Sequence, residues 1–445
     1  MKETVIQFGE GNFLRASFDY FIDVLNKNSL YDGKVVVVQP LREGMVDILN
    51  NQNGKYNLFI RGINEGKIYD EKIEINSISR GINCYTNFEE YLQLADNPDF
   101  RFIVSNTTEA GIAFSEKDKF EDQPADSFPG KLTQLLYRRY KKKLPGFIFL
   151  PCELIDNNAD FLQKYILDYA DLWNLGENFK EWILSENQFS NTLVDGITTG
   201  YPRDDIKEFQ ARISWHDRLI DVAEYFNLWV IEGNYEKELP LQKAGLSVIW
   251  TNDVKPYKKR KVRILNGCHT AMVTGALLYN LETVKDCLDD ELVSSYLRHI
   301  IEKEILPTLG NSEEDIEFAK NVIERFNNPF IKHYLESIAL NSIAKYETRV
   351  LPTILEYYDK FERIPQGLIM SFASLIFYYK NCKASDSPET IHFVQESSVQ
   401  EIIENKDFWK RDISFLEEDI YKYYRFIEEN GMENTYIKVL ENVEP

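Results

Sequence analysis

The stretch TVIQFGEGNFLRASFDYFIDVL, residues 4–25, decides the predicted fold of the first half of the chain. Thr4 to Phe8 is a short β-branched and apolar run that leads into two glycines, Gly9 and Gly11. Apolar residues then recur at helical spacing, at positions 13, 18, 21, 22 and 25. The order predicts a strand, a glycine turn and a helix, whose free backbone NH groups are suited to a pyrophosphate.

This glycine turn departs from the dinucleotide-binding fingerprint at two positions. Leu14 stands where the third glycine of the fingerprint is expected, and Gln39 ends the second strand where an acid would bind the ribose. The pattern alone is equally compatible with an ordinary glycine turn.

The remaining pattern divides the chain into two parts. Buried-type strands at 35–38, 102–104 and 147–150 alternate with helix candidates at 87–95 and 132–143, which is typical of a parallel, doubly wound sheet. Residues 56–78 read as an inserted antiparallel hairpin, which makes the sheet mixed. Long helical periodicities follow position 250. The prediction is an α/β Rossmann-like domain with a mixed sheet over 1–250 and an all-α domain over 251–445.

Composition excludes several classes of partner. The chain has 72 acidic and 51 basic residues, and a net charge of −21 would repel nucleic acid. No apolar run is long enough to span a bilayer and the first residues do not resemble a secretion signal, so we expect a cytoplasmic protein with no membrane partner. The five cysteines show no disulfide pattern. An anionic substrate would need local cations.

The segment SNTTEAGI, residues 105–112, follows a buried strand at the sheet edge where ligands bind in such folds. Thr107, Thr108 and Glu109 are therefore candidate cofactor-binding residues. An alternative is a helix cap, with Thr107 or Thr108 as the N-cap and Glu109 in the first turn.

The segment KVRILNGCHTAM, residues 261–272, carries the strongest chemical pattern. On a regular helix, Asn266 lies about 140° and His269 about 80° around from Lys261, so the three side chains share one side. A lysine and an amide suit carbonyl reduction, because both can donate to an oxygen that gains negative charge. The alternative is a helix with a solvated lysine and a packed histidine. The five histidines are scattered without metal-ligand spacing, so no metal is expected.

The spacing of Lys261, Asn266 and His269 resembles the signature of the polyol-specific long-chain dehydrogenases, the mannitol dehydrogenase family. The resemblance extends over nearly the whole chain through FGEGNFLRA, SNTTEAGI, LPCELIDNN, NTLVDGITTGYPRDD and ERFNNPFIKHYLESIALNSIAKYETRVLP. The setting IWTNDVKPYKKRKVRILNGCHT is most similar to members that act on sugar acids.

The resemblance implies an NAD-dependent enzyme that reversibly reduces a small sugar acid. It implies that Lys261 is the general acid/base, Asn266 the oxyanion donor and His269 a substrate-binding residue. The matching cofactor loop comprises Gly9, Gly11, Asn12, Phe13 and Arg15. Gln39, at the ribose position, leaves NADP open, because Arg42 nearby could receive a 2′-phosphate.

Several substrate-site positions depart from the family pattern. Asp195 matches a substrate-site aspartate, but Gly196 replaces the arginine that usually follows it. Leu154 stands where polyol-oxidising members have an asparagine, and Asn158 is the candidate substitute.

A second set of candidates concerns the substrate carboxylate. Ser337 occupies the place of a family arginine, while Lys345 and Arg349 follow at i, i+4, which puts both cations on one helical face. They are candidate carboxylate ligands; the alternative is a solvated face paired with Glu347 or other acids. Arg203 is the next candidate.

Two other functions remain open at this point. One is activity on another ketouronate or on a sugar alcohol, and the other is a nucleotide-binding protein without turnover. The oligomeric state is not indicated by the sequence.

Overall fold

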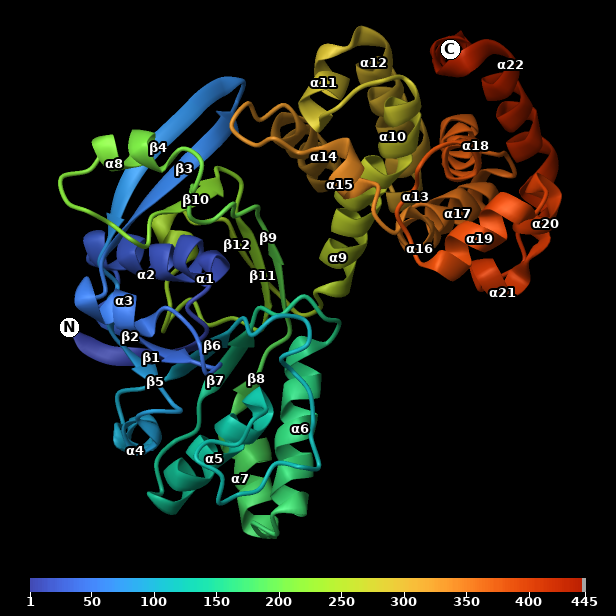
Figure 1. Ribbon diagram of the computed structural model, residues 1–445. Helices are drawn as coiled ribbons and strands as arrows, with labels where there is room; N and C mark the ends of the chain where they lie inside the picture. Colours follow the sequence, from blue (N-terminus) through green and yellow to red (C-terminus); the bar gives the residue numbers. More distant parts are fainter. Residues whose placement is uncertain (442–445) are drawn as a thin grey trace. The chain divides into compact units, whose positions relative to one another are not determined.

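The computed structural model describes residues 1–441, which fall into two compact units (Figure 1). The first unit comprises residues 1–62 and 67–257, and the second comprises residues 63–66 and 258 onward. The predicted succession of an α/β half and a helical half is confirmed.

A six-stranded parallel sheet forms the centre of the first unit. From one edge to the other its strands are β5 (Ile78–Asn83), β2 (Gly33–Gln39), β1 (Lys2–Phe8), β6 (Phe102–Ser105), β7 (Ile148–Pro151) and β8 (Gln188–Phe189). The chain moves outward from β1 to β2 and β5, and then from β6 to β7 and β8. The order therefore reverses between β1 and β6, and a ligand crevice is expected at the carboxyl ends of these two strands.

Helices cover both faces of this sheet (Figure 1), because successive strand residues point to opposite sides. Val5 and Val35 pack in the cluster that contains residues of α1 (Asn12–Ala16), α2 (Phe18–Lys27) and α3 (Val46–Asn51). Ile6 and Val36 pack in the opposite cluster with α4 (Phe88–Gln93), α5 (Phe128–Lys141), α6 (Asn158–Leu172) and α7 (Glu177–Glu186). The single helix predicted after the glycine turn is broken at Ser17, where φ is −115° and ψ is −80°.

Two smaller sheets complete the first unit. The predicted hairpin forms β3 (Tyr56–Asn64) and β4 (Lys67–Ile75), and β3 pairs in parallel with β10 (Asp221–Glu224). In the other sheet, β11 (Leu228–Glu232) pairs antiparallel with β9 (Thr192–Asp195) and parallel with β12 (Val248–Thr251). The mixed strand directions therefore lie outside the central sheet, which is parallel throughout. The short helix α8 (Ile206–Ala211) precedes β10.

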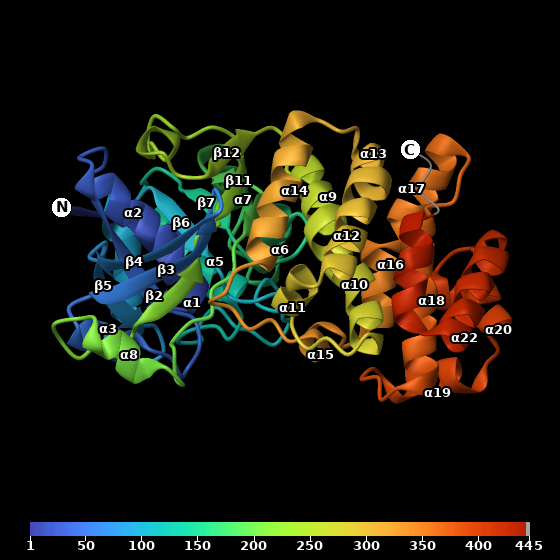
Figure 2. The same cartoon turned by 90° about the horizontal axis from the view of Figure 1, so that it is seen from above.

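The second unit is helical. Its central helix, α18 (Gln366–Asn381), is buried along most of its length and packs against α10 (Gly267–Leu278) and α22 (Glu417–Glu441), as Figure 1 and Figure 2 show. Buried Glu304 fixes the start of α18 by accepting hydrogen bonds from the NH groups of Gly367 and Leu368, at 2.7 and 2.8 Å. The other helices are α9 (Lys255–Lys261), which leads in from the first unit, α11 (Val284–Asp289), α12 (Glu291–His299), α13 (Leu306–Leu309), α14 (Glu313–Phe326), α15 (Leu335–Ile338), α16 (Ser342–Arg349), α17 (Leu351–Phe361), α19 (Pro388–Glu396), α20 (Val399–Glu404) and α21 (Lys406–Trp409).

Two π-helical turns, Val262–Asn266 and Ile300–Ile305, interrupt the helical unit. Such turns are rare in proteins and occur frequently at functional sites. None of the helices over residues 1–441 combines the length and the apolar character that crossing a membrane requires.

Candidate functional site

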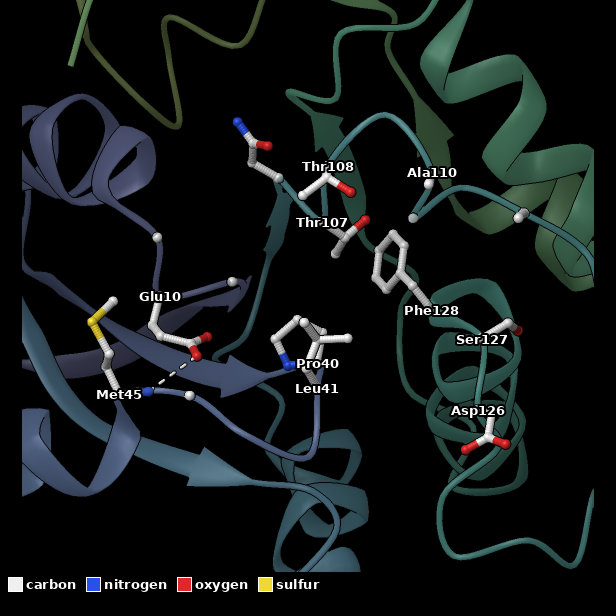
Figure 3. A pocket seen from close by; sticks show the side chains of 16 residues that line it. Glu10, Pro40, Leu41, Met45, Thr107, Thr108, Ala110, Asp126, Ser127 and Phe128 are labelled. Carbon is white, nitrogen blue, oxygen red and sulfur yellow. Dashed lines mark hydrogen bonds between the residues drawn. The ribbon is translucent and has the colours of Figure 1, made fainter. Parts of the chain in front are cut away.

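The first unit contains a pocket of about 380 Å³ at the carboxyl edge of the parallel sheet (Figure 3). Its walls come from the turns that follow β1, β2 and β6 and from the start of α5. A second hollow, lined by Leu154 and Glu109, shares Asn106, Thr108 and Ala110 with the first. The two form one continuous groove at the topological switch point, where dinucleotides bind in doubly wound folds.

The two glycines of the first turn have different roles in this pocket. Gly9 has a φ of +112°, and a Cβ there would lie 2.9 Å from the carbonyl oxygen of Asn106. Both the backbone conformation and the close approach of β6 therefore require glycine. A Cβ on Gly11 would meet nothing within 4 Å, so Gly11 faces open space. An open glycine cradle of this kind fits the pyrophosphate of a dinucleotide.

The turn after β6 is held by a buried carboxylate. Glu153 accepts hydrogen bonds from the NH and the hydroxyl of Thr107, both at 2.9 Å, and from the hydroxyl of Ser105 at 3.0 Å. Burial raises the pKa of Glu153. Thr108 has a φ of +72°, which is rare for a β-branched residue and typical of ligand sites. The alternative of a helix cap at Thr107 or Thr108 is wrong, because the chain forms no helix between the end of β6 at Ser105 and the start of α5 at Phe128.

Gly9, Gly11, Thr107 and Thr108, all predicted cofactor residues, line the pocket, whereas others of the predicted set do not. Arg15 is buried, and its guanidinium binds the carbonyl of Leu219 at 2.6 Å, Asn12 at 2.7 Å and Asp221 at 3.4 Å. Arg15 therefore ties α1, which follows the glycine turn, to the start of β10. The remaining predicted residues outside the main pocket are Asn12, Phe13, Gln39 and Glu109.

The structure adds pocket residues that the sequence analysis did not select, among them Glu10, Met45, Asp126 and Phe128. Burial raises the pKa of the Glu10 carboxyl, against the opposing effect of the NH of Met45 and the charge of Arg15. Glu10 lies between the two selected glycines. Its position between two glycines of the GEG turn could have identified it as a pocket residue from the sequence.

Lys261 and Asn266 lie at the two ends of a π turn. Lys261 ends α9, the π turn spans Val262–Asn266, and the NH of Gly267 binds the carbonyl of Val262, five residues back. The regular α-helix assumed from the sequence is therefore wrong at this point. A turn that bonds residues five apart places residue i+5 nearly above residue i, so the π turn brings Lys261 and Asn266 closer to one face than the 140° of a regular helix.

The cations on both sides of Lys261 are anchored to neighbouring helices. Arg260 binds Asp315 and Glu314 at 2.6 and 3.0 Å. Arg263 is buried and binds Glu356 at 2.7 Å. These ion pairs hold the helix on either side of Lys261. The side chain of Asn266 makes no hydrogen bond to any of residues 1–441 and is half-buried, so its amide is available to a ligand.

His269 lies one turn further along, on α10. Its ring stacks on Phe326 of α14, with centroids 4.1 Å apart, and lies edge-on to His333 at 5.9 Å. Its Nε2 is buried without a hydrogen-bond partner among the described residues. Burial, with help from neighbouring positive charges, lowers the pKa of His269 to about 3. The imidazole is therefore neutral at physiological pH.

After burial, the neighbours that lower the pKa of His269 are His333 and the three permanent cations Arg325, Arg349 and Lys345. The alternative pairing of Lys345 or Arg349 with Glu347 does not form, and Glu347 instead binds Arg411 at 3.4 Å. Nζ of Lys345 donates to the carbonyl of Ile338 at 2.8 Å. Burial lowers the pKa of both Lys345 and Arg349.

Arg349 is a half-buried cation without a carboxylate partner among residues 1–441. An uncompensated guanidinium in this position is costly unless a ligand anion pairs with it. Arg325, on α14, was not selected from the sequence. Its position in the ERFNNPF segment, next to Phe326, was the signal that could have identified it.

The other two substrate candidates lie in the first unit. Asp195 is buried at the end of β9. The buried amide of Asn158 binds the carbonyls of Pro151, Glu153 and Thr192, and its oxygen accepts from the NH of Thr192 at 3.1 Å. These bonds use the donors and the acceptor of Asn158 within the protein, so its amide holds the surrounding backbone and has no group left for a substrate.

Residues 1–441 contain no group of three histidine, cysteine, aspartate or glutamate side chains arranged to hold a metal ion. The five cysteines are free thiols.

Comparison with known proteins adds two family matches. The mannitol dehydrogenase Rossmann domain matches residues 3–243, and the mannitol dehydrogenase C-terminal domain matches residues 253–423. The altronate oxidoreductase of Bacillus subtilis (strain 168) is 44% identical over 451 residues, which cover 97% of this chain and 94% of the relative. The altronate oxidoreductase of Yersinia enterocolitica (serotype O:8 / biotype 1B) is 46% identical over 386 residues, which cover 85% of this chain and 80% of the relative.

Two solved structures share the fold. Substrate-free D-sorbitol dehydrogenase aligns with a TM-score of 0.86 at 22% identity, covering 98% of this chain and 95% of the other. The ternary complex of Pseudomonas fluorescens mannitol 2-dehydrogenase with NAD and D-mannitol aligns with a TM-score of 0.73 at 21% identity, covering 100% and 95%.

Proposed function

The chain belongs to the mannitol dehydrogenase family, and from that premise we propose that it is an NAD-dependent altronate oxidoreductase that reversibly reduces D-tagaturonate to D-altronate. Curated relatives that match most of the chain at 44% and 46% identity are named altronate oxidoreductase. The groove at the switch point of the parallel sheet fits a dinucleotide, with Gly9 and Gly11 at the pyrophosphate position.

The choice of an acidic substrate rests on the guanidinium of Arg349, which has no carboxylate partner within residues 1–441. It lies with Lys345 in the positive field around His269, on a protein whose net charge is −21. A ketouronate differs from a neutral ketose by a carboxylate, and a partly desolvated carboxylate requires a charged donor. We assign Arg349, assisted by Lys345, to that carboxylate.

Within this proposal the three residues of the π-turn region act on the reacting oxygen and its neighbours. A bound nicotinamide supplies the hydride in reduction and accepts it in oxidation. Lys261 holds a proton at Nζ, gives it to the oxygen as the carbonyl becomes a hydroxyl, and takes it back in the reverse reaction. Asn266 donates from its amide to the same oxygen, and neutral His269 binds a substrate hydroxyl.

A substrate panel tests the proposal. Purified protein is assayed with NADH on tagaturonate, fructuronate and neutral ketoses, and with NAD on altronate, mannonate and polyols. The expected result is the highest kcat/KM with tagaturonate and altronate. A higher kcat/KM with fructuronate or with a polyol would show that this compound, and not tagaturonate, is the substrate. Binding of NADH without turnover of any of these compounds would favour a non-catalytic nucleotide-binding protein.

A further inference from the structure

The end of β2 does not supply a ribose-binding acid in this protein. Gln39 stands at that position, and its buried side chain is occupied by the following turn. Its amide nitrogen donates to the carbonyls of Leu41 and Arg42 at 2.9 and 3.1 Å, and its oxygen accepts from the NH of Val46 at 3.3 Å. Both side-chain donors of Gln39 are used within the 40–46 turn, and its oxygen already accepts from the NH of Val46, so Gln39 is a structural residue of that turn.

A carboxylate from the glycine turn reaches the same place. Oε1 of Glu10 accepts a hydrogen bond from the NH of Met45 at 3.3 Å, in the turn that Gln39 holds. Figure 3 shows this bond and the Glu10 carboxylate directed toward the space beside Pro40 and Leu41. One carboxylate oxygen is thus fixed by the backbone, and the group lies at the pocket wall next to the end of β2.

Gly44 makes room for this arrangement. A Cβ at position 44 would collide with Oε1 of Glu10 and with the side-chain amide of Gln39. The φ of Gly44 is not in the left-handed region, so the backbone conformation does not itself demand glycine there. The absence of a side chain is explained by the close approach of Glu10 and Gln39.

We propose that the Glu10 carboxylate accepts hydrogen bonds from the adenosine ribose hydroxyls and thereby selects NAD(H) over NADP(H). A carboxylate binds a 2′-hydroxyl as an acceptor but repels a 2′-phosphate, which carries negative charge at the same position. The inference deepens the proposed function and rests on its use of a nicotinamide dinucleotide.

The cation nearest to this turn does not offset the repulsion. Arg42 is exposed, does not line the pocket, stacks over Tyr85 at 4.5 Å and lies 3.7 Å from Asp126, which does line it. A dinucleotide phosphate at this end of the pocket would therefore face two carboxylates, those of Glu10 and Asp126.

Binding measurements test the assignment without relying on turnover. The dissociation constants of NADH and NADPH are measured by cofactor fluorescence, and those of 5′-AMP and adenosine 2′,5′-bisphosphate by calorimetry. The measurements compare the unsubstituted full chain with the variant Glu10→Gln and with the matched control Glu181→Gln. Glu181 is an exposed acid on α7. The expected result is that the parent and the control prefer NADH, whereas Glu10→Gln shifts the ratio of NADPH to NADH dissociation constants by about tenfold or more toward NADPH.

A second variant covers the case in which Glu10→Gln disturbs the turn. Gly44→Ala leaves the charge in place but displaces the carboxylate, and it should shift the same ratio in the same direction. An unchanged ratio in both folded variants, with NADH still bound, would overturn the role of Glu10 and leave the proposed function intact. A parent protein that binds neither dinucleotide, or that prefers NADPH, would overturn the inference; the absence of all binding would also remove the proposed function.

Discussion

The imidazole of His269 lies flat on the ring of Phe326, with an interplanar angle of 16° and a centroid separation of 4.1 Å. The stack joins α10 to α14 and fixes the plane of the imidazole next to the π turn that carries Lys261 and Asn266. Because burial lowers the pKa of His269 to about 3, the ring can donate or accept a hydrogen bond but does not act as an acid at neutral pH.

The low pKa of His269 predicts a pH dependence of stability. The unfolded histidine binds a proton near its ordinary pKa of about 6.5, whereas the folded one does so only near 3, so the unfolded state binds more protons in between. Stability from this residue is present above about pH 6.5 and is lost as the pH falls. Denaturant titrations give the free energy of unfolding at pH 7 and at pH 5. This free energy should fall less between the two pH values in His269→Gln than in the parent, by up to about 1 kcal/mol per pH unit. Equal losses would contradict the low pKa.

Lys261→Ala should lower kcat by about 10²- to 10⁴-fold while leaving the dissociation constant of NADH nearly unchanged, because it removes a proton donor needed only as the hydroxyl forms. Steady-state kinetics and NADH fluorescence measure the two effects. The matched control is Lys259→Ala, which removes a cation of the same helix that pairs with Glu356 at 2.9 Å. Comparable turnover in Lys261→Ala would remove Lys261 from the mechanism.

Asn266→Ala should lower kcat by roughly 10²-fold or more, as expected when one oxyanion donor is lost. The amide makes no hydrogen bond within residues 1–441, so its removal leaves no partner unsatisfied and the thermal midpoint should stay close to that of the parent. A large fall in the midpoint with little change in kcat would show that the residue is structural.

Arg349→Ala should raise KM for tagaturonate by about tenfold or more, and Lys345→Ala should do so to a smaller degree. The KM of any neutral ketose that is still turned over should change much less, because such a substrate has no carboxylate to lose its partner. Arg298→Ala, which removes an exposed cation of α12, is the control. Retention of the parent's preference for the acid in both variants would move the carboxylate site elsewhere, with Arg203 and Arg325 as the next residues to replace.

Dialysis against a strong chelator should leave activity unchanged, because the proposed proton donor and oxyanion donor are the side chains of Lys261 and Asn266. Activity is compared before and after dialysis, with and without added zinc. Loss on dialysis that zinc restores would contradict metal independence.

Local patterns in the sequence predicted the parts of the fold that depend on neighbouring residues. The run at Thr4 to Phe8 and the apolar run at 35–38 became β1 and β2, and the helical periodicity at 313–326 became α14. Alternation and helical spacing are local properties, since they follow from which face of one element is buried. The same applies to the proposed catalytic segment, in which the order of Lys261, Asn266 and His269 is visible in the sequence itself.

Contacts between residues far apart in the chain decided the strand pairing and the side-chain partners that local sequence patterns do not predict. The sequence match placed Arg15 in a cofactor loop, but Leu219 and Asp221, some 200 residues away, engage its guanidinium. The hairpin strand β3 joined β10 instead of the central sheet. The sequence by itself thus determined most of the elements and supplied the residues that we propose as reacting groups. The tertiary structure decided which polar groups bind distant partners, as Arg15 does, and which we could propose as ligand-binding groups, as we do for Glu10 and Arg349. The reason is that a polar side chain forms its hydrogen bonds with whatever groups the whole fold brings into contact with it.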